Sequence, residues 1–249
     1  MRYITGSFYD LENPQKFSDA FLNIFDSINS ETGVYCSDNL FTFSRNLSFL
    51  KDVKFMQLFK KYTQDDPQAR GILWRTATLI WAGRNGLKLE GDFVECGCYR
   101  GITAKIIYDY FDLSSKGGKK YYLYDLFEYE DSFAHHSMPA HSKSLYQEVK
   151  NLFKNDKNAL IINGKLPDIL EKNAPEKISF LHLDLNNVDG EISTLEVLFD
   201  KLVSGAIIIL DDFGWFGYRE QCRAELKWFA NKGYQILEMP TGQGMVIKT

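Results

Sequence analysis

The stretch Gly91-Asp-Phe-Val-Glu95-Cys-Gly97-Cys-Tyr-Arg-Gly101 decides the fold. Its first half is a short apolar run that predicts a buried strand, and the helical pattern that follows begins near Gly101. Gly97 permits a tight turn and a close approach of the backbone. The spacing E-x-G-x-x-x-G differs from the G-x-G-x-x-G of most dinucleotide sites. Glu95 at the strand end suits a ligand with a cationic group better than a pyrophosphate, and a strand-turn-helix without a ligand is the alternative.

Short apolar runs alternate with helical stripes from this stretch to the end of the chain. Such alternation predicts crossover units and a parallel sheet. Only Pro240–Gly244 separates the last two runs, which is too short for a crossover helix, so the final strand should be antiparallel to its neighbour. We therefore expect a doubly wound α/β sheet of seven strands with the last one antiparallel. The predicted strands are Asp92–Cys96, Lys120–Asp125, Ala159–Asn163, Ile178–Asp184, Ala206–Asp211, Tyr234–Met239 and Met245–Lys248.

The N-terminal third of the chain has a different pattern, and we predict two domains, residues 1–88 and 89–249. Apolar residues recur at helical spacing from Phe17 to Ile28 and again from Ile72 to Ile80. The stretch Val34–Lys51 between them is poorly periodic, and we interpret it as a loop that folds over a ligand. Arg75, just before the second domain, either reaches the binding pocket or only anchors the N-terminal helices.

Composition excludes several classes of function. The 249 residues hold 29 Lys and Arg against 33 Asp and Glu, a net charge of −4, and basic runs do not exceed two residues. Nucleic acid is therefore disfavoured as a partner. The N-terminus does not resemble a secretory signal, and no apolar run approaches the ~20 residues that a membrane-spanning helix needs. Four cysteines without a disulfide-like framework fit a cytoplasmic location. We interpret Cys96 and Cys98 as small buried residues rather than as a metal pair.

An acidic residue ends the second predicted strand. Asp125 follows the apolar run that comes after the glycine turn, and an acid at this place hydrogen-bonds the ribose hydroxyls of an adenosyl group. Phe127, two residues later, is suited to wall the adenine. The alternative is a strand-end Asp that caps a turn. Further along, His135, His136 and His141 cluster in a segment that we assign either to substrate contact or to a plain surface loop.

More acids end the next two predicted strands. His182-Leu-Asp184 ends one strand and Asp211-Asp212 ends the next. If these strands are parallel neighbours, their ends lie about 4.8 Å apart. Three crowded carboxylates are costly without a cation, and an all-oxygen cluster suits Mg²⁺ first and Mn²⁺ or Ca²⁺ next. The alternative is a set of solvated carboxylates. The stretch Gly242-Gln243-Gly244 predicts a hairpin, and a polar contact at the pocket rim is the alternative role.

Taken together, these motifs resemble a class I S-adenosylmethionine-dependent methyltransferase, and more narrowly the macrocin O-methyltransferase type of sugar methyltransferase. The resemblance covers roughly residues 68–248. The glycine element is specific only to the class, and the Asp184 and Asp211-Asp212 pair is the part specific to the type. The stretches that carry the resemblance are Gly91–Gly101, Tyr124–Glu128, His182–Asp184 and Leu210–Gly214.

The resemblance implies a Rossmann-like domain that uses Mg²⁺ to transfer methyl from S-adenosylmethionine to a sugar hydroxyl, with residues 1–88 as part of an acceptor lid. The metal ligands of the family map onto Asp184, Asp211 and Asp212, and we assign Asp184 and His182 to catalysis. Members often have a second Asp where this chain has Asn186, and a neutral amide cannot take a proton. The general base stays open between a metal-bound Asp, His182, another His and deprotonation by the metal alone. The implied cofactor residues are Glu95, Gly97, Tyr99, Arg100, Gly101, Asp125 and Phe127.

The expected substrate is a small saccharide, as a sugar nucleotide, a surface-polysaccharide precursor or a glycosylated natural product. The first rivals are a metal-independent N-methyltransferase and an O-methyltransferase of a catechol-like diol. A non-catalytic binding protein is disfavoured by the intact glycine turn, and a nicotinamide dehydrogenase by the missing G-x-G-x-x-G. Whether the chain forms a homo-oligomer stays open.

Overall fold

The computed structural model describes residues 2–29, 31–115, 118–129, 131 and 137–249. They form two compact units, Met1–Trp74 and Arg75–Thr249, and each is described by itself. Within the described ranges, no helix is both long enough and apolar enough to cross a bilayer. Cys36, Cys96, Cys98 and Cys222 are free thiols.

The second unit is built on a seven-stranded sheet of order β6-β5-β4-β7-β8-β10-β9, which confirms the predicted strand number. The first five strands in this order are parallel, and β10 runs antiparallel to both β8 and β9, as expected from the short connection before it. The chain leaves β4 toward β5 and later returns to its other side with β7. In open α/β sheets, ligands bind at the carboxyl ends of the strands where the order reverses in this way, here β4 and β7. The strands are β4 (Asp92–Cys96), β5 (Tyr121–Asp125), β6 (Ala159–Asn163), β7 (Ile178–Leu183), β8 (Leu202–Leu210), β9 (Leu237–Glu238) and β10 (Gly244–Ile247).

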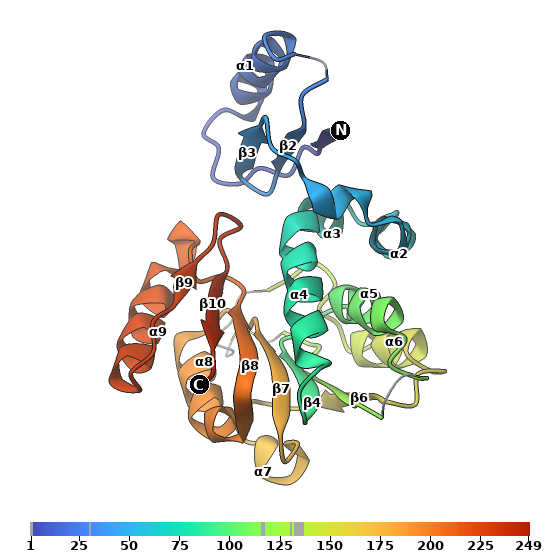
Figure 1. Cartoon of the computed structure of the whole chain (residues 1–249), viewed down its shortest axis with the longest axis vertical. Coiled ribbons are helices and arrows are strands. Elements are labelled where there is room, and N and C mark those ends of the chain that lie inside the picture. The colour runs from blue at the N-terminus through green and yellow to red at the C-terminus, as the bar shows by residue number, and fades with distance from the viewer. Residues whose placement is uncertain (1, 30, 116–117, 130, 132–136) are drawn as a thin grey trace. The chain divides into compact units, whose positions relative to one another are not determined.

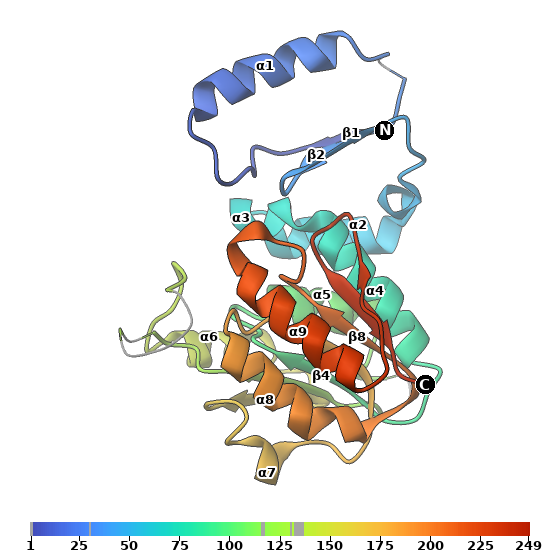
Figure 2. The same ribbon diagram turned by 90° about the vertical axis from the view of Figure 1, so that its left-hand side faces the viewer.

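Helices cover both faces of this sheet, as a doubly wound fold requires (Figures 1 and 2). Helices α4, α5 and α6 lie on one side, and α8 and α9 lie on the other. The central strands are buried on both faces, and β7 has no exposed position. The helices are α4 (Leu73–Gly86), α5 (Ile102–Phe111), α6 (Leu145–Leu152), α7 (Leu170–Asn173), α8 (Val188–Leu198) and α9 (Arg219–Asn231), with 3-10 turns at Phe199–Lys201 and Phe216–Tyr218.

One strand is much shorter than its sequence suggests. The run Tyr234–Met239 predicts six residues of strand, but only Leu237–Glu238 pairs, with β10 alone. Both residues are exposed because β9 is the edge of the sheet. An edge strand lacks the second neighbour that holds central strands in register, so the apolar run overstates its length.

The first unit contains a small sheet of order β1-β2-β3, so the interpretation of Val34–Lys51 as a loop is wrong. Strands β2 (Val34–Ser37) and β3 (Leu40–Phe43) form a hairpin whose two turn residues, Asp38 and Asn39, both have left-handed φ angles of 56° and 54°. Tight two-residue hairpin turns need this conformation, and Asp and Asn tolerate it best after glycine. The remaining elements are β1 (Arg2–Ile4), α1 (Pro14–Asp26), a 3-10 turn at Ser48–Lys51, α2 (Val53–Thr63) and α3 (Pro67–Gly71).

Candidate active site

The glycine turn after β4 lies against the end of β7. Gly97 has a φ angle of +88°, and its amide donates to the Tyr124 carbonyl at 2.8 Å. A Cβ atom at this position would lie 1.8 Å from the Asp184 carbonyl oxygen. Glycine is therefore required here both by conformation and by space. Gly101, which begins α5 at φ +67°, is limited in the same way by Phe153 at 3.0 Å.

Asp125 joins this turn to the loop after β5. Its two carboxylate oxygens accept hydrogen bonds from the backbone amides of Tyr99 and Phe127, each at 2.6 Å. Both donors have left-handed φ angles, 46° and 59°, so the carboxylate stabilises two backbone positions that are unfavourable without it. The two bonds therefore fix the glycine turn against the loop after β5.

The other predicted cofactor residues differ in their exposure. Tyr99 is partly buried, and its hydroxyl accepts from the Ala140 amide at 2.6 Å. Arg100 is exposed, whereas Phe127 is buried and packs on the Tyr146 ring with centroids 5.3 Å apart. His135 and His136 lie outside the described residues.

Behind the glycine turn, a histidine lies between two buried carboxylates. His182 Nδ1 is 3.7 Å from Glu95 Oε1, and its Nε2 is 3.3 Å from Asp211 Oδ1. The other Glu95 oxygen accepts from the Tyr121 hydroxyl at 2.5 Å. Burial alone would lower the pKa of His182, but the neighbouring carboxylates of Asp211 and Glu95 raise it well above its usual value. The Glu95 carboxylate thus faces His182 and Tyr121. The His182 ring lies between two carboxylates, which favour its protonated form.

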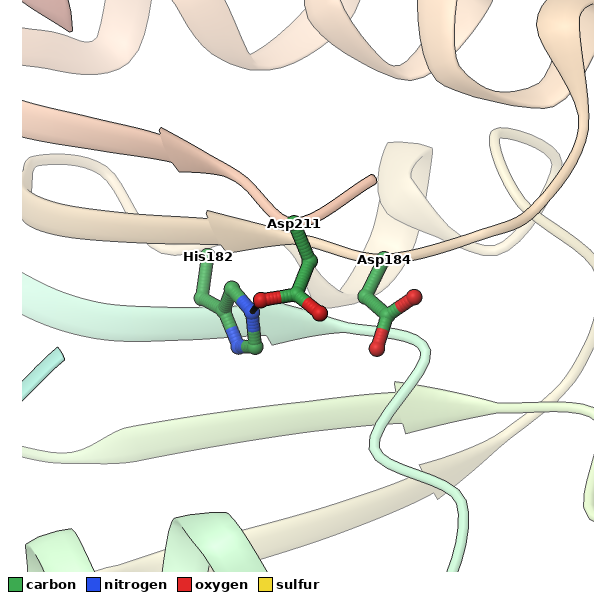
Figure 3. A group of neighbouring side chains, drawn as sticks. All are labelled: His182, Asp184 and Asp211. Atoms are coloured by element: carbon green, nitrogen blue, oxygen red, sulfur yellow. Dashed lines mark hydrogen bonds and ion pairs between the residues drawn. The ribbon is translucent and has the colours of Figure 1, made fainter. Parts of the chain in front are cut away.

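The acids predicted at the ends of β7 and β8 meet. The Asp184 amide donates to the Cys96 carbonyl, and the Asp211 amide donates to the Leu183 carbonyl. Each acid therefore extends the hydrogen-bond ladder of its strand by one bond. Figure 3 shows that the side chains of His182, Asp184 and Asp211 come from neighbouring strands and gather at one place. Their possible ligand atoms all lie within 4.8 Å of one another.

The two carboxylates of this cluster have opposite pKa shifts. Burial, followed by the charges of Asp211 and Asp212, raises the pKa of Asp184 well above its usual range. The Asn186 amide donates to Asp184 Oδ1 at 3.2 Å, and within the part of the chain that the structure describes, Oδ2 of Asp184 accepts no hydrogen bond. Burial also opposes the charge of Asp211, but the Arg75 guanidinium and the bonds from His182 and Gln243 hold the pKa of Asp211 below its usual range.

Arg75 and Gln243 are the residues that the sequence analysis assigned least firmly. Arg75 Nη1 lies 2.8 Å from Asp211 Oδ2 and 3.3 Å from Asp212 Oδ1, and its guanidinium stacks over the Trp215 ring at 4.7 Å. Gln243 is fully buried and donates to Asp211 Oδ1 at 2.7 Å. The Asp212 carboxylate therefore points to Arg75 and stands outside the cluster of Figure 3.

The donor set fits a hard divalent cation. Carboxylate oxygens are the ligands that Mg²⁺ prefers in proteins. Asp184 and Asp211 are the carboxylate ligands that the geometry provides, with His182 beside them and Asp212 next in the chain. Burial first, and then the charges of Asp211 and Asp212, raise the pKa of Asp184, and a cation would relieve the repulsion between the charges.

Comparison with known families gives a match over most of the second unit. The family model of the macrocin-O-methyltransferase (TylF) matches residues 84–239, well over half of the chain. No curated protein matches the sequence significantly.

Solved structures share the fold at low sequence identity. The O-methyltransferase NovP superposes with a TM-score of 0.59 at 18% identity, over 78% of this chain and 88% of that one. CalS11, a calicheamicin methyltransferase, gives a TM-score of 0.63 at 11% identity, over 97% and 95% of the two chains. The Podospora anserina methyltransferase PaMTH1, solved with S-adenosylhomocysteine, gives 0.53 at 14% identity, over 97% and 99%. These likenesses show the fold, a Rossmann-like sheet with an antiparallel strand near its edge.

Proposed function

The chain belongs to the macrocin-O-methyltransferase family and is an S-adenosylmethionine-dependent methyltransferase, and on this premise we propose that it methylates a saccharide hydroxyl with the help of Mg²⁺. The observation that carries the proposal is the pair Asp184 and Asp211, whose oxygens approach within 4.8 Å beside the glycine turn. CalS11 and NovP lend support as structural neighbours, since CalS11 is described as a TDP-rhamnose 3'-O-methyltransferase and NovP as an O-methyltransferase.

We assign the cofactor to the carboxyl ends of β4 and β5. S-adenosylmethionine supplies an activated methyl group on its sulfonium, so the protein has mainly to place donor and acceptor in line. Gly97 and Gly101 supply positive φ angles in the turn after β4, and Asp125 ends the second strand, where an acid binds the ribose hydroxyls of an adenosyl group. Tyr99, Arg100 and Phe127 stay predicted contacts. Glu95 also stays a prediction, because its carboxylate is already engaged by Tyr121 and approached by His182.

We assign the metal to Asp184 and Asp211, with Asp212 as the third carboxylate. When bound, Mg²⁺ lowers the pKa of a hydroxyl and orients it. Asp184 is our candidate for the general base that takes the hydroxyl proton, because its Oδ2 accepts no hydrogen bond from any described residue. His182 is less suited, since both of its ring nitrogens face carboxylates. We propose that His182 positions Asp211.

The acidic cluster favours a sugar hydroxyl over an amine. An alkyl hydroxyl has a pKa far above 7 and needs help to lose its proton, whereas a neutral amine is already a nucleophile. In an enzyme that needs no cation, three neighbouring carboxylates would lower the stability of the fold, because burying like charges close together is costly. A catechol-like diol can use the same cation, and it is the nearest alternative. The role of the N-terminal region as an acceptor lid stays a prediction, as do a cytoplasmic location, a part in polysaccharide biosynthesis and homo-oligomer formation.

A competition experiment among acceptors tests the proposal. The purified protein is incubated with S-adenosylmethionine, Mg²⁺ and a panel of acceptors, namely sugar nucleotides, glycosides, catechols and amines. The gain of a methyl group by each acceptor is detected by mass spectrometry. We expect methyl transfer to at least one saccharide. Methyl transfer confined to amines or catechols would contradict the proposal, and an Asp184→Asn variant in the same screen controls for contaminating activity.

A further inference from the structure

Arg75 occupies the carboxylates that the proposed cation needs. Its Nη1 atom lies 2.8 Å from Asp211 Oδ2 and 3.3 Å from Asp212 Oδ1, so a single nitrogen bridges both acids. The three side chains are only about a tenth exposed, which reduces screening of their charges by water. A guanidinium is charged at every physiological pH. The Arg75 guanidinium therefore places a permanent positive charge within the proposed metal site.

The hydrogen bonds of Asp211 leave a cation little choice of oxygen. Oδ1 accepts from Gln243 at 2.7 Å and faces His182 Nε2 at 3.3 Å. Each carboxylate oxygen has about two acceptor sites, so Oδ1 is filled. Oδ2 is the oxygen through which Asp211 can ligate a cation, and this is the oxygen that Arg75 contacts.

We infer that Arg75 acts as a built-in counter-ion that competes with the divalent cation for Asp211 and Asp212. This inference rests on the proposed function, because it assumes that the acids bind a cation. In the metal-free protein Arg75 stabilises the two acids, and on cation binding it must withdraw from Asp211 Oδ2, because a ligated cation takes that oxygen. This withdrawal costs cation affinity. The stacked Trp215 ring reports the guanidinium position, since Arg75 lies 4.7 Å from its centre.

Calorimetric titration with Mn²⁺ and Mg²⁺ tests the inference on the full chain. Arg75→Gln removes the charge and keeps a hydrogen-bond donor, and Arg75→Lys keeps the charge. Arg84→Gln is a matched control on the same helix, where Arg84 stacks on Tyr110 instead. We expect Arg75→Gln to bind the cation at least about fivefold more tightly, the lower end of typical coupling between two ligands. Arg75→Lys and Arg84→Gln should stay near the wild-type affinity.

A second readout follows the wild-type protein and does not depend on how well the Arg75 variants fold. Cation titration should change the tryptophan fluorescence of the wild type, because Arg75 leaves the Trp215 ring. The same titration should give no such change in Trp215→Phe, which lacks the reporting ring. Equal or weaker cation binding by a folded Arg75→Gln variant overturns the inference and leaves the proposed metal site intact. A cation that binds without any Trp215 signal also overturns it. If neither the wild type nor Arg75→Gln binds a cation, the metal part of the proposed function fails together with the inference.

Discussion

Gly97→Ala tests whether the glycine turn and the acidic site are one unit. The added Cβ would lie 1.8 Å from the Asp184 carbonyl oxygen, whereas a close carbon–oxygen contact needs about 3.3 Å. The ends of β4 and β7 would therefore have to separate by about 1.5 Å, the difference of these two distances. The hydrogen bond from the Asp184 amide to the Cys96 carbonyl, now 2.9 Å, would be lost.

The expected loss of stability has two parts. A side chain at a φ angle of +88° costs about 1–3 kcal/mol. Forcing an extra carbon into a packed site costs about 1–3 kcal/mol more. The sum, about 2–6 kcal/mol, is a large share of the roughly 5–15 kcal/mol that stabilises a typical domain. We expect Gly97→Ala either to unfold readily or to fold with the acidic site displaced.

Gly233→Ala is a matched control, because Gly233 has a similar φ angle of +81° but nothing within 4 Å of an added Cβ. Urea unfolding of both variants and the wild type, followed by circular dichroism, gives the three free energies of unfolding. The difference between the variants isolates the collision with Asp184, which we expect to exceed about 1 kcal/mol. A Gly97→Ala variant that is no less stable than Gly233→Ala would refute the close approach of the glycine turn to β7.

Three further predictions concern the cofactor, the metal site and pH. Asp125→Ala should weaken S-adenosylhomocysteine binding by about 1.5–3 kcal/mol in calorimetry, since bonds to a charged group are lost, and unchanged affinity would argue against this placement. Asp211→Asn should lower methyl transfer by about 100-fold or more while S-adenosylhomocysteine affinity stays nearly unchanged, and a parallel loss of both would contradict separate sites. Burial raises the pKa of Glu225 to about 7, so its contribution to stability is full below about pH 4.5 and is lost as pH rises through 7. Glu225→Gln should therefore flatten the fall in urea-unfolding free energy over this window, and an unchanged pH slope would rule out Glu225 as its source.

The sheet of the second unit was predictable because its strands are short apolar runs set apart by helical stripes. The β2–β3 hairpin was not, because all four positions of β2 are buried and no alternation marks it as a strand. The signal present was the pair Asp38-Asn39, whose residue types suit a two-residue turn. Strand β9 was overestimated because apolar residues alone do not report a sheet edge.

The site was predictable where residues follow strand ends, because parallel strands bring their carboxyl ends to one edge. This logic places Asp184 beside Asp211 without any knowledge of side-chain geometry. It cannot foresee which way a carboxylate turns, so the engagement of Asp212 by Arg75 and the contact of Gln243 with Asp211 emerged only from the structure. Both partners are distant in sequence from the acids they bind, and no local spacing marks such pairs.

The most direct test of the account is the rate of methyl transfer to a saccharide acceptor by enzyme stripped of metal with EDTA, measured before and after Mg²⁺ is restored. We predict that the stripped enzyme has almost no activity and that Mg²⁺ restores it, because Asp184 and Asp211 gather to hold a cation. Methyl transfer at full rate by the metal-free enzyme would contradict the account and would favour a metal-independent methyltransferase.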